Sequence, residues 1–247
     1  MKLDCSIFIL AFFLSVMLQG QDTVQKASNF VIPHLHYGVG LPGGDLADRF
    51  GSHFDLGVGT SVLTQKGLFF GFGFNLLFGS DVKENVLSSL LTTEGGIIGT
   101  DMQFASIFLR ERGYHAYGRA GFLFKIRDLG KASGILCTGG IGVLSHRIRF
   151  VDDFDSIIQL SEPYSRGYDR LSRGVSFHQF LGYLHLSKNR LVNFVAGFEF
   201  TQGLTSNVRR YNYDQRSTDT DRRIDLLSTM KIGWLFPIAL TREQRYY

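Results

Sequence analysis

The chain has 247 residues, a length that suits one barrel with long loops or one large soluble domain. Glycine contributes 29 residues and phenylalanine 23, against only 4 prolines, which is unlike the composition of ordinary helical proteins. The formal net charge of +4 does not by itself indicate nucleic acid, and we expect no nucleic-acid partner.

The N-terminus has the pattern of a secretory signal peptide. Lys2 precedes an apolar run over 7–17, and small Gly20 stands at a plausible cleavage point. The run is too short to cross a bilayer as a helix, although a buried or anchoring helix is the alternative. We therefore predict a signal peptide over 1–20, export, and one barrel domain over 21–247. Gln21 stands where a lipoprotein would need cysteine.

The segment 67–78 alternates strictly between large apolar residues and small or polar ones. Its phenylalanines and leucines occupy every second position, and Gly71, Gly73 and Asn75 lie between them. Because side chains of a strand alternate faces, one face is apolar and bulky and the other is small or polar. This pattern favours a barrel in lipid over a soluble sandwich.

Similar segments recur along the chain, and they predict an all-β fold, a transmembrane antiparallel up-and-down barrel of about 10 strands. The predicted strands are 30–39, 53–64, 67–78, 101–110, 114–126, 134–144, 147–153, 175–186, 191–202 and 224–237. The segment 147–153 is short and charged. If it is a loop, a second strand must also be lost, because bacterial barrels have an even count, which gives eight.

Short and long connections alternate, as they do on the periplasmic and extracellular sides of a barrel. The long ones are 40–52, 79–100, 154–174 and 203–223, and tight turns are expected at 65–66, 111–113, 145–146 and 188–190. Residues 81–91 carry apolar side chains at helical spacing behind Asp81, so a short helix is expected in this extracellular loop.

The inward faces of the predicted strands carry charges of both signs. We expect a lumen ion-pair network of Asp55, Arg119, Lys125, Glu199, Asp225 and Lys231. The interior of an eight- to ten-stranded barrel is about filled by its own side chains, so these charges should pair and leave no wide channel. A proton or ion path is the alternative, and with it the function of a narrow channel.

The sequence indicates no cofactor, no metal site and no enzyme activity. His34 and His36 share the inward face, but the sequence shows no third ligand near them, and the acidic groups at 152–155 and 214–221 lack a calcium-loop pattern. The glycines of 38–43 match a dinucleotide fingerprint by letters only. A lipid hydrolase or acyltransferase stays open, since its serine and histidine would meet only in space.

The long loops are rich in arginine and tyrosine, the residue types that bind charged groups and anchor interfaces. We predict an extracellular rim that binds another protein subunit or meets lipopolysaccharide phosphates. Its residues are Tyr164, Arg166, Tyr168, Arg170, Arg173, Arg209, Arg210 and Tyr211.

The segment 231–236 resembles the signal that the barrel-assembly machinery reads on outer-membrane proteins. Its matching residues are Lys231, Gly233 and Phe236, although the chain continues for eleven residues beyond it. With the leader, the glycine-rich strands and the strings over 42–51 and 167–171, the chain resembles small PorT-like barrels of the Bacteroidota. The resemblance implies location in the outer membrane, contact with its lipid, and a non-enzymatic accessory role in a complex for protein secretion or barrel insertion.

Overall fold

The structure is a computed structural model that describes residues 29–126, 132–152, 156–187, 192–209 and 211–240. The predicted signal peptide 1–20, Arg210 and the turn 188–190 lie outside the described residues. Within the described part, no helix has the length and apolarity needed to cross a membrane.

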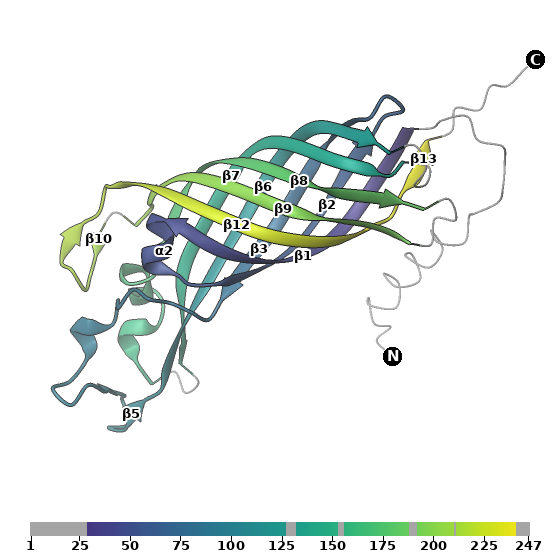
Figure 1. The fold of residues 1–247 in the computed structure, drawn as a ribbon. Helices are drawn as coiled ribbons and strands as arrows, with labels where there is room; N and C mark the ends of the chain where they lie inside the picture. The colour runs from purple at the N-terminus through teal and green to yellow at the C-terminus, as the bar shows by residue number, and fades with distance from the viewer. Residues whose placement is uncertain (1–28, 127–131, 153–155, 188–191, 210, 241–247) are drawn as a thin grey trace, which may run out of the picture.

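Eight long antiparallel strands close into a ring, each paired with its neighbour in the sequence (Figure 1). The last of them, β12, pairs with β1 over eleven residue pairs and so closes the barrel. The eight are β1 (Asn29–Gly44), β2 (His53–Leu63), β3 (Leu68–Gly79), β6 (Ile107–Lys125), β7 (Gly134–Asp152), β8 (Ser172–Leu186), β9 (Asn193–Asn207) and β12 (Arg222–Leu235). Short β13 (Ile238–Leu240) continues along the start of β1.

The barrel has eight strands, the lower of the two predicted counts, and ten is wrong. The turn expected at 111–113 lies within β6, and the one expected at 145–146 lies within β7. Gly113 lies opposite His146 in an unbroken β6–β7 ladder, so a polar group followed by glycine did not mark a turn here. Of the predicted segment 147–153, residues 147–152 are therefore the end of β7, and Asp153 lies outside the described residues. Most of 101–110 belongs to β6 or to two-residue β5 (Phe104–Ala105).

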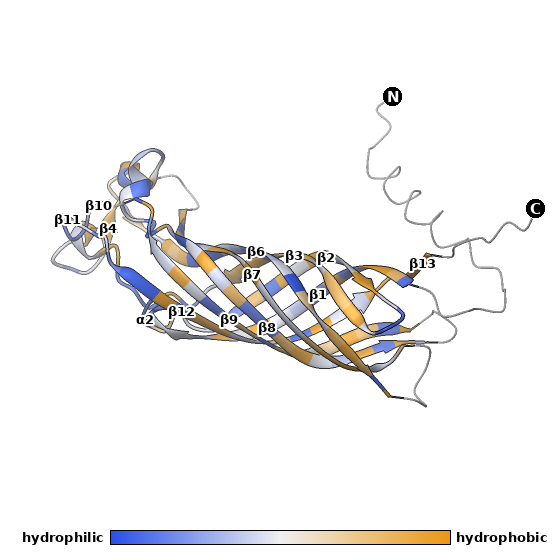
Figure 2. Cartoon of the chain, turned by 90° about the horizontal axis from the view of Figure 1, so that it is seen from above, coloured by the Kyte–Doolittle hydropathy of each residue, from blue (hydrophilic) through white to orange (hydrophobic). Residues whose placement is uncertain are grey.

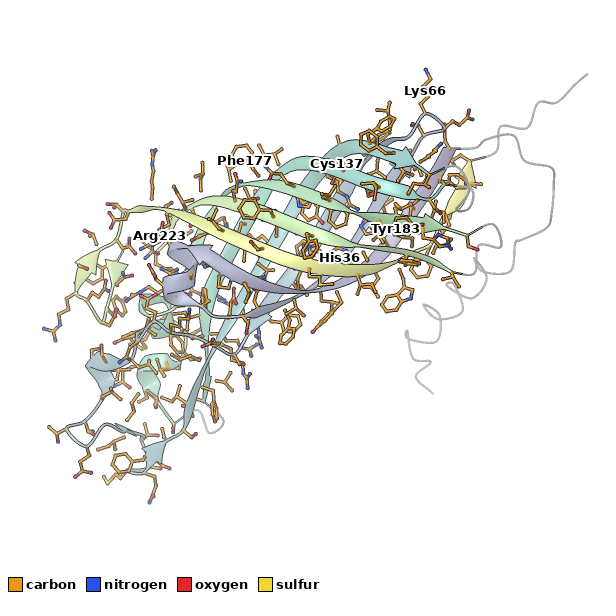
Figure 3. The ribbon with its side chains drawn as sticks, viewed as in Figure 1. His36, Lys66, Cys137, Phe177, Tyr183 and Arg223 are labelled. Carbon is orange, nitrogen blue, oxygen red and sulfur yellow. The ribbon has the colours of Figure 1, made fainter. Side chains whose placement is uncertain are left out.

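The other connections follow the expected alternation. Four long ones lie at one end of the barrel, which we call the long-loop end: the first loop (45–52), the second (80–106), the third (153–171) and the fourth (208–221). The opposite end, the short-turn end, includes the tight turn before β3, where Lys66 is drawn in Figure 3.

The helical part of the loops differs from the prediction. The only α-helix among the described residues is α2 (Asp45–Arg49), in the first loop. In the segment 81–91 only the 3-10 turn η1 (Ser88–Leu90) is helical. Val86 and Leu87 of that segment are buried in the loop core, and Val82 and Leu90 pack against it.

The wall of the barrel is apolar outside and polar inside, as the alternation predicts. Phe72 is 77% exposed, and outward-facing Phe177, Cys137 and Tyr183 are visible on the wall in Figure 3. Figure 2 shows the resulting alternation of apolar and polar residues along the strands. A soluble protein would bury such rings, so this surface suits hydrocarbon.

Glycines on the inner face make room for large polar side chains. A Cβ at Gly73 would lie 2.5 Å from Cζ of Tyr117, and one at Gly57 would lie 2.2 Å from Nε2 of His36. Both contacts are shorter than atoms allow. The inward glycines are therefore part of how an eight-stranded interior is filled.

Apolar side chains gather at both ends of the lumen. At the short-turn end the buried residues include Leu63, Phe69 and Leu123. At the long-loop end, Phe50, Leu144 and Val86 belong to a cluster that runs from the barrel into the loops. The polar lumen lies between these two apolar clusters.

Candidate functional site: the lumen and the loop assembly

The centre of the lumen is an ion triad. Lys231 Nζ on β12 lies 2.6 Å from Glu199 Oε1 on β9 and 3.1 Å from Asp55 Oδ2 on β2. All three residues are at least 95% buried. The predicted network therefore forms around these three residues, and its charges pair with one another.

Hydrogen bonds extend the triad around the wall. Asn75 Nδ2 donates to Asp55 Oδ2 at 2.9 Å, and the amide oxygen of Asn75 lies 2.9 Å from His36 Nε2. Because an amide presents both a donor and an acceptor, Asn75 joins the carboxylate to the imidazole. The chain of contacts crosses the lumen from β12 to β1, β2 and β3.

A stack of aromatic rings fills the space beside the triad. The ring centroid of Tyr117 lies 4.6 Å from that of His115 and 4.2 Å from that of His178. Ser176 Oγ lies 3.0 Å from His115 Nε2, which is the kind of serine and histidine contact that an enzyme could use. Ser176 is 0% and His115 1% exposed, however, so the pair is closed to a substrate.

The other three predicted members of the network do not join the triad. Arg119 contacts His34 Nε2 and Ser61 Oγ, and its guanidinium lies over the Phe69 ring. Lys125 is exposed at the short-turn end and donates to the Gln65 carbonyl. The lumen network is thus smaller than predicted, because Arg119 binds uncharged groups and Lys125 lies at a strand end.

Asp225, the sixth predicted member, belongs to a separate buried cluster near the mouth. Its Oδ2 lies 2.8 Å from His146 Nε2 and accepts a hydrogen bond from Thr205. Phe50 of the first loop packs edge-on against the His146 ring. The loop therefore rests directly on the polar wall of the barrel.

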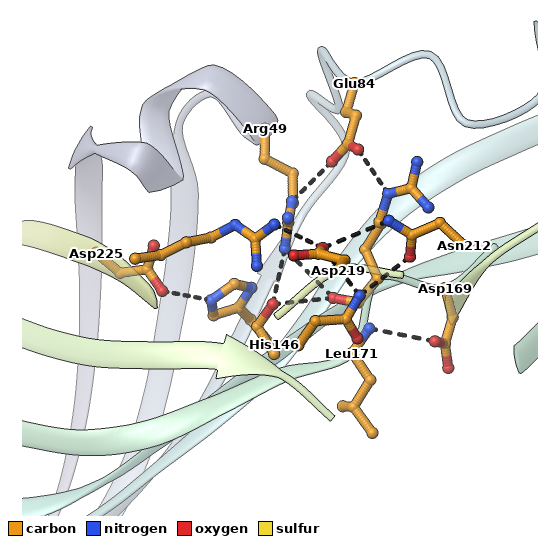
Figure 4. Close-up of polar contacts among 12 residues, drawn as sticks. Arg49, Glu84, His146, Asp169, Leu171, Asn212, Asp219 and Asp225 are labelled. Atoms are coloured by element: carbon orange, nitrogen blue, oxygen red, sulfur yellow. Dashed lines mark hydrogen bonds and ion pairs between the residues drawn. The ribbon is translucent and has the colours of Figure 1, made fainter. Parts of the chain in front are cut away.

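Arg170 joins three of the long loops. It donates to Glu84 of the second loop at 2.6 Å and to Asp214 of the fourth at 2.7 Å. Figure 4 shows Glu84 together with its other arginine partner, Arg49. Burial alone would lower the pKa of Arg170, but the hydrogen bonds to Asp214 and Glu84 outweigh it, and the pKa is raised. The cation is thus held firmly by its partners.

The same Glu84 also receives a contact from the first loop. Arg49 Nε donates to Glu84 Oε2 at 2.7 Å, and Arg49 Nη1 donates to Ser172 Oγ at 3.0 Å. Burial lowers the pKa of Arg49, an effect that Glu84 opposes. One carboxylate thus joins two arginines from different loops, and all four long loops form one assembly.

Two further ion pairs hold the fourth loop. Arg209 Nη2 donates to Asp169 at 2.8 Å, and Arg223 Nη2 donates to Asp219 at 2.6 Å. Burial raises the pKa of Asp219, but donors from Asn207 and Arg223 outweigh it and lower the pKa to about 2. Asp219 therefore stays ionised at neutral pH and accepts these bonds.

The predicted rim residues divide into two groups. Tyr164, Arg166, Arg173 and Tyr211 are exposed, and Arg173 lies over the Tyr114 ring on the outer wall. Tyr168 and Arg170 are buried, and Arg209 is held by Asp169, so these three connect loops rather than face solvent. Arg210 lies outside the described residues. A run of arginine and tyrosine does not distinguish the two groups, because burial depends on carboxylates brought in from other loops.

The tip of the second loop exposes an apolar patch. Ile98 on β4 (Ile97–Ile98) and Phe104 on β5 lie directly opposite one another, 55% and 61% exposed. Met102, in the turn between them, is 89% exposed and has a φ of 61°, an uncommon value for a side chain other than glycine. We call Ile98, Met102 and Phe104 the tip patch, and the prediction of a helix in this loop did not include it.

No metal site is found in the described part of the chain, where no three metal-binding side chains cluster. His34 and His36 share the lumen face as predicted, with ring centroids 5.7 Å apart. Of the expected assembly signal, Lys231 and Gly233 face the lumen from β12, and Phe236 follows the strand and donates its amide to the Pro33 carbonyl. This seam is where the last strand meets the first.

No protein-family model and no curated protein matches the chain. Among solved structures, Neisserial surface protein A is similar at 9% identity and a TM-score of 0.44, over 83% of this chain and 96% of that one. Ail, the attachment invasion locus protein of Yersinia pestis, is similar at 11% identity and a TM-score of 0.45, over 85% and 100%. A second structure of Ail, in complex with the heparin analogue sucrose octasulfate, has a TM-score of 0.42 at 11% identity, over 85% and 99%.

Proposed function

We propose that the chain is a closed, non-enzymatic outer-membrane barrel whose loop assembly binds other envelope proteins. The binding would serve a complex for protein secretion or barrel insertion, which is the accessory role that the resemblance to PorT-like barrels implies. The tip patch is the observation that carries it, because it displays three apolar side chains to water, each more than half exposed.

The outer wall supports the membrane placement. Large apolar side chains such as Phe72, Phe198 and Trp234 cover it, and in water such a surface would promote aggregation. A closed barrel leaves no strand edge unpaired in hydrocarbon. The long loops would then face the outside of the cell and the short turns the periplasm.

The lumen argues against the two rival functions. The triad and the stacked rings occupy the interior, which suits neither a wide pore nor an ion path. The Ser176–His115 contact is enclosed on all sides, so it does not favour a lipid-modifying enzyme. A fixed scaffold with a recognition surface fits this interior best.

Recovery of partners from gently solubilised membranes tests the proposal. We expect the full-length protein to bring down other envelope proteins, and Phe104→Asp to reduce this recovery because it places a charge in the tip patch. Gln103→Asp is the matched control, since it adds the same carboxylate one residue away on an exposed polar position. Recovery of the barrel alone, or equal loss in both variants, would contradict the proposal.

A further inference from the structure

Four arginines line the outer face of β6 and β7 where these strands leave the barrel. Arg112 lies directly opposite Arg147, and Arg110 directly opposite Arg149. The neighbouring strands end just here: β3 reaches only Glu111, and β8 begins opposite His146. The Arg112–Arg147 pair therefore lies at the barrel rim, and the Arg110–Arg149 pair lies two residues farther along the strands. We call these four residues the arginine ladder.

The ladder faces the same side as the apolar wall. It alternates with Glu111 and Ile148, which are buried on the inner face at 1% exposure. Along β6 the next outward residue toward the barrel is Tyr114, and along β7 it is Ser145. The arginines are thus a direct continuation of the wall that we place in lipid.

Among the residues that the structure describes, no carboxylate forms an ion pair with the ladder. Like charges directly opposite on a sheet repel each other and destabilise it. Within the described ranges, the arginines with a carboxylate partner are Arg49, Arg166, Arg170, Arg209 and Arg223. None of the four ladder arginines belongs to this set, and the side-chain hydrogen bond that the described residues show for the ladder runs from Arg112 to the Glu111 carbonyl at 2.7 Å. Two like-charged pairs at one site call for an anion from outside the chain.

We propose that the arginine ladder binds the phosphates of an anionic glycolipid in the outer leaflet of the membrane. Guanidinium groups hold phosphate through paired hydrogen bonds. Exposed Arg173, opposite Ser145 and over the Tyr114 ring, adds a fifth cation at the base of the ladder.

The position of the ladder selects a lipid rather than a soluble anion. Tyr114 is the kind of residue that marks the boundary of hydrocarbon. At about 3.3 Å per residue, Arg112 and Arg110 lie roughly 7 and 13 Å farther along the strand, and tilt shortens these heights. A headgroup layer begins at that boundary and is several ångströms thick. The inference rests on the outer-membrane placement proposed above.

Titration of the purified full-length protein with diphosphorylated lipid A, in zwitterionic micelles, tests the inference. We expect Arg110→Gln/Arg149→Gln and Arg112→Gln/Arg147→Gln each to raise the Kd about tenfold or more. Each double variant also removes a repulsion, so the barrel is expected to keep its folded stability in urea. Arg166→Gln/Arg216→Gln is the control, because it removes two exposed loop arginines and the same charge.

An unchanged Kd in both ladder variants, or the same loss in the control, would overturn the inference. So would equal binding of dephosphorylated lipid A, or displacement of the lipid by millimolar inorganic phosphate. Insertion of the barrel into phosphatidylcholine vesicles tests the membrane placement separately from lipid A binding by the ladder. A wild-type barrel that does not insert overturns both proposals, whereas one that inserts and binds lipid A without the ladder overturns this one alone.

Discussion

Lys231 reaches Glu199 diagonally across the β9–β12 pair. Its direct neighbour on β9 is Gly197, and the 2.6 Å contact is with the glutamate two residues farther on. Gly38, opposite Lys231 on β1, leaves room for the lysine, because a Cβ there would lie 2.9 Å from Lys231 Cγ. The same ammonium bonds Asp55 on the other side of β1. A single lysine thus neutralises two carboxylates in a water-poor interior.

Lys231→Met is therefore expected to destabilise the barrel by about 3–5 kcal/mol, because two buried carboxylates lose their cation. The free energy of unfolding in urea, measured in lipid vesicles, gives the size of the loss. Lys66→Met at the exposed short turn should change it little. Adding Asp55→Asn and Glu199→Gln to Lys231→Met should recover most of the loss, and no recovery would show that the lysine acts by packing alone.

Arg170→Met is expected to loosen the loops while the barrel stays closed. Arg170 bonds Glu84 and Asp214, so its loss disconnects the second, third and fourth loops. Limited proteolysis should cut these loops severalfold faster, and the strands should remain resistant. Arg166→Met, whose ion pair with Glu162 is exposed, is the control and should have little effect. Equal protection of the loops in both variants would contradict the role given to Arg170.

The fourth loop should weaken in acid through Asp219. Its pKa is about 2 in the folded protein against an ordinary 3.8, so the ionised form stabilises the loop above pH 4. This contribution is lost as the pH falls from about 4 to about 2. Pepsin cleavage of the loop across this range should accelerate toward low pH in the wild type and less so in Asp219→Asn. An identical pH dependence of both proteins would exclude Asp219 as the cause.

The strand pattern could be predicted from the sequence because lipid and lumen impose opposite demands on alternate residues. The number of strands could not, since the polar residues before Gly113 look like a turn although β6 continues through them. That misreading also concealed the arginine ladder. Arg110 and Arg149 are far apart in the sequence, and only the β6–β7 register brings them face to face.

The sequence could predict which residues face the lumen, but not which of them contact one another. The alternation of inward and outward residues along each strand identified Lys231, Glu199 and Asp55 as lumen residues. It could not tell that Arg119 would bond His34 rather than a carboxylate, because reach across the lumen depends on strand tilt and on which neighbours are glycine. The burial of Arg170 likewise depends on Glu84 and Asp214, which come from distant loops.

The pairing of β1 with β12 joins the first and the last of the eight long strands, with His34 opposite Leu235. The first strand to emerge during synthesis must therefore wait for the last before its outer edge is satisfied. Until then it presents a row of free amides and carbonyls that another chain could capture. We expect an escort for the nascent polypeptide in transit, since only arrival of the final strand removes this exposed edge.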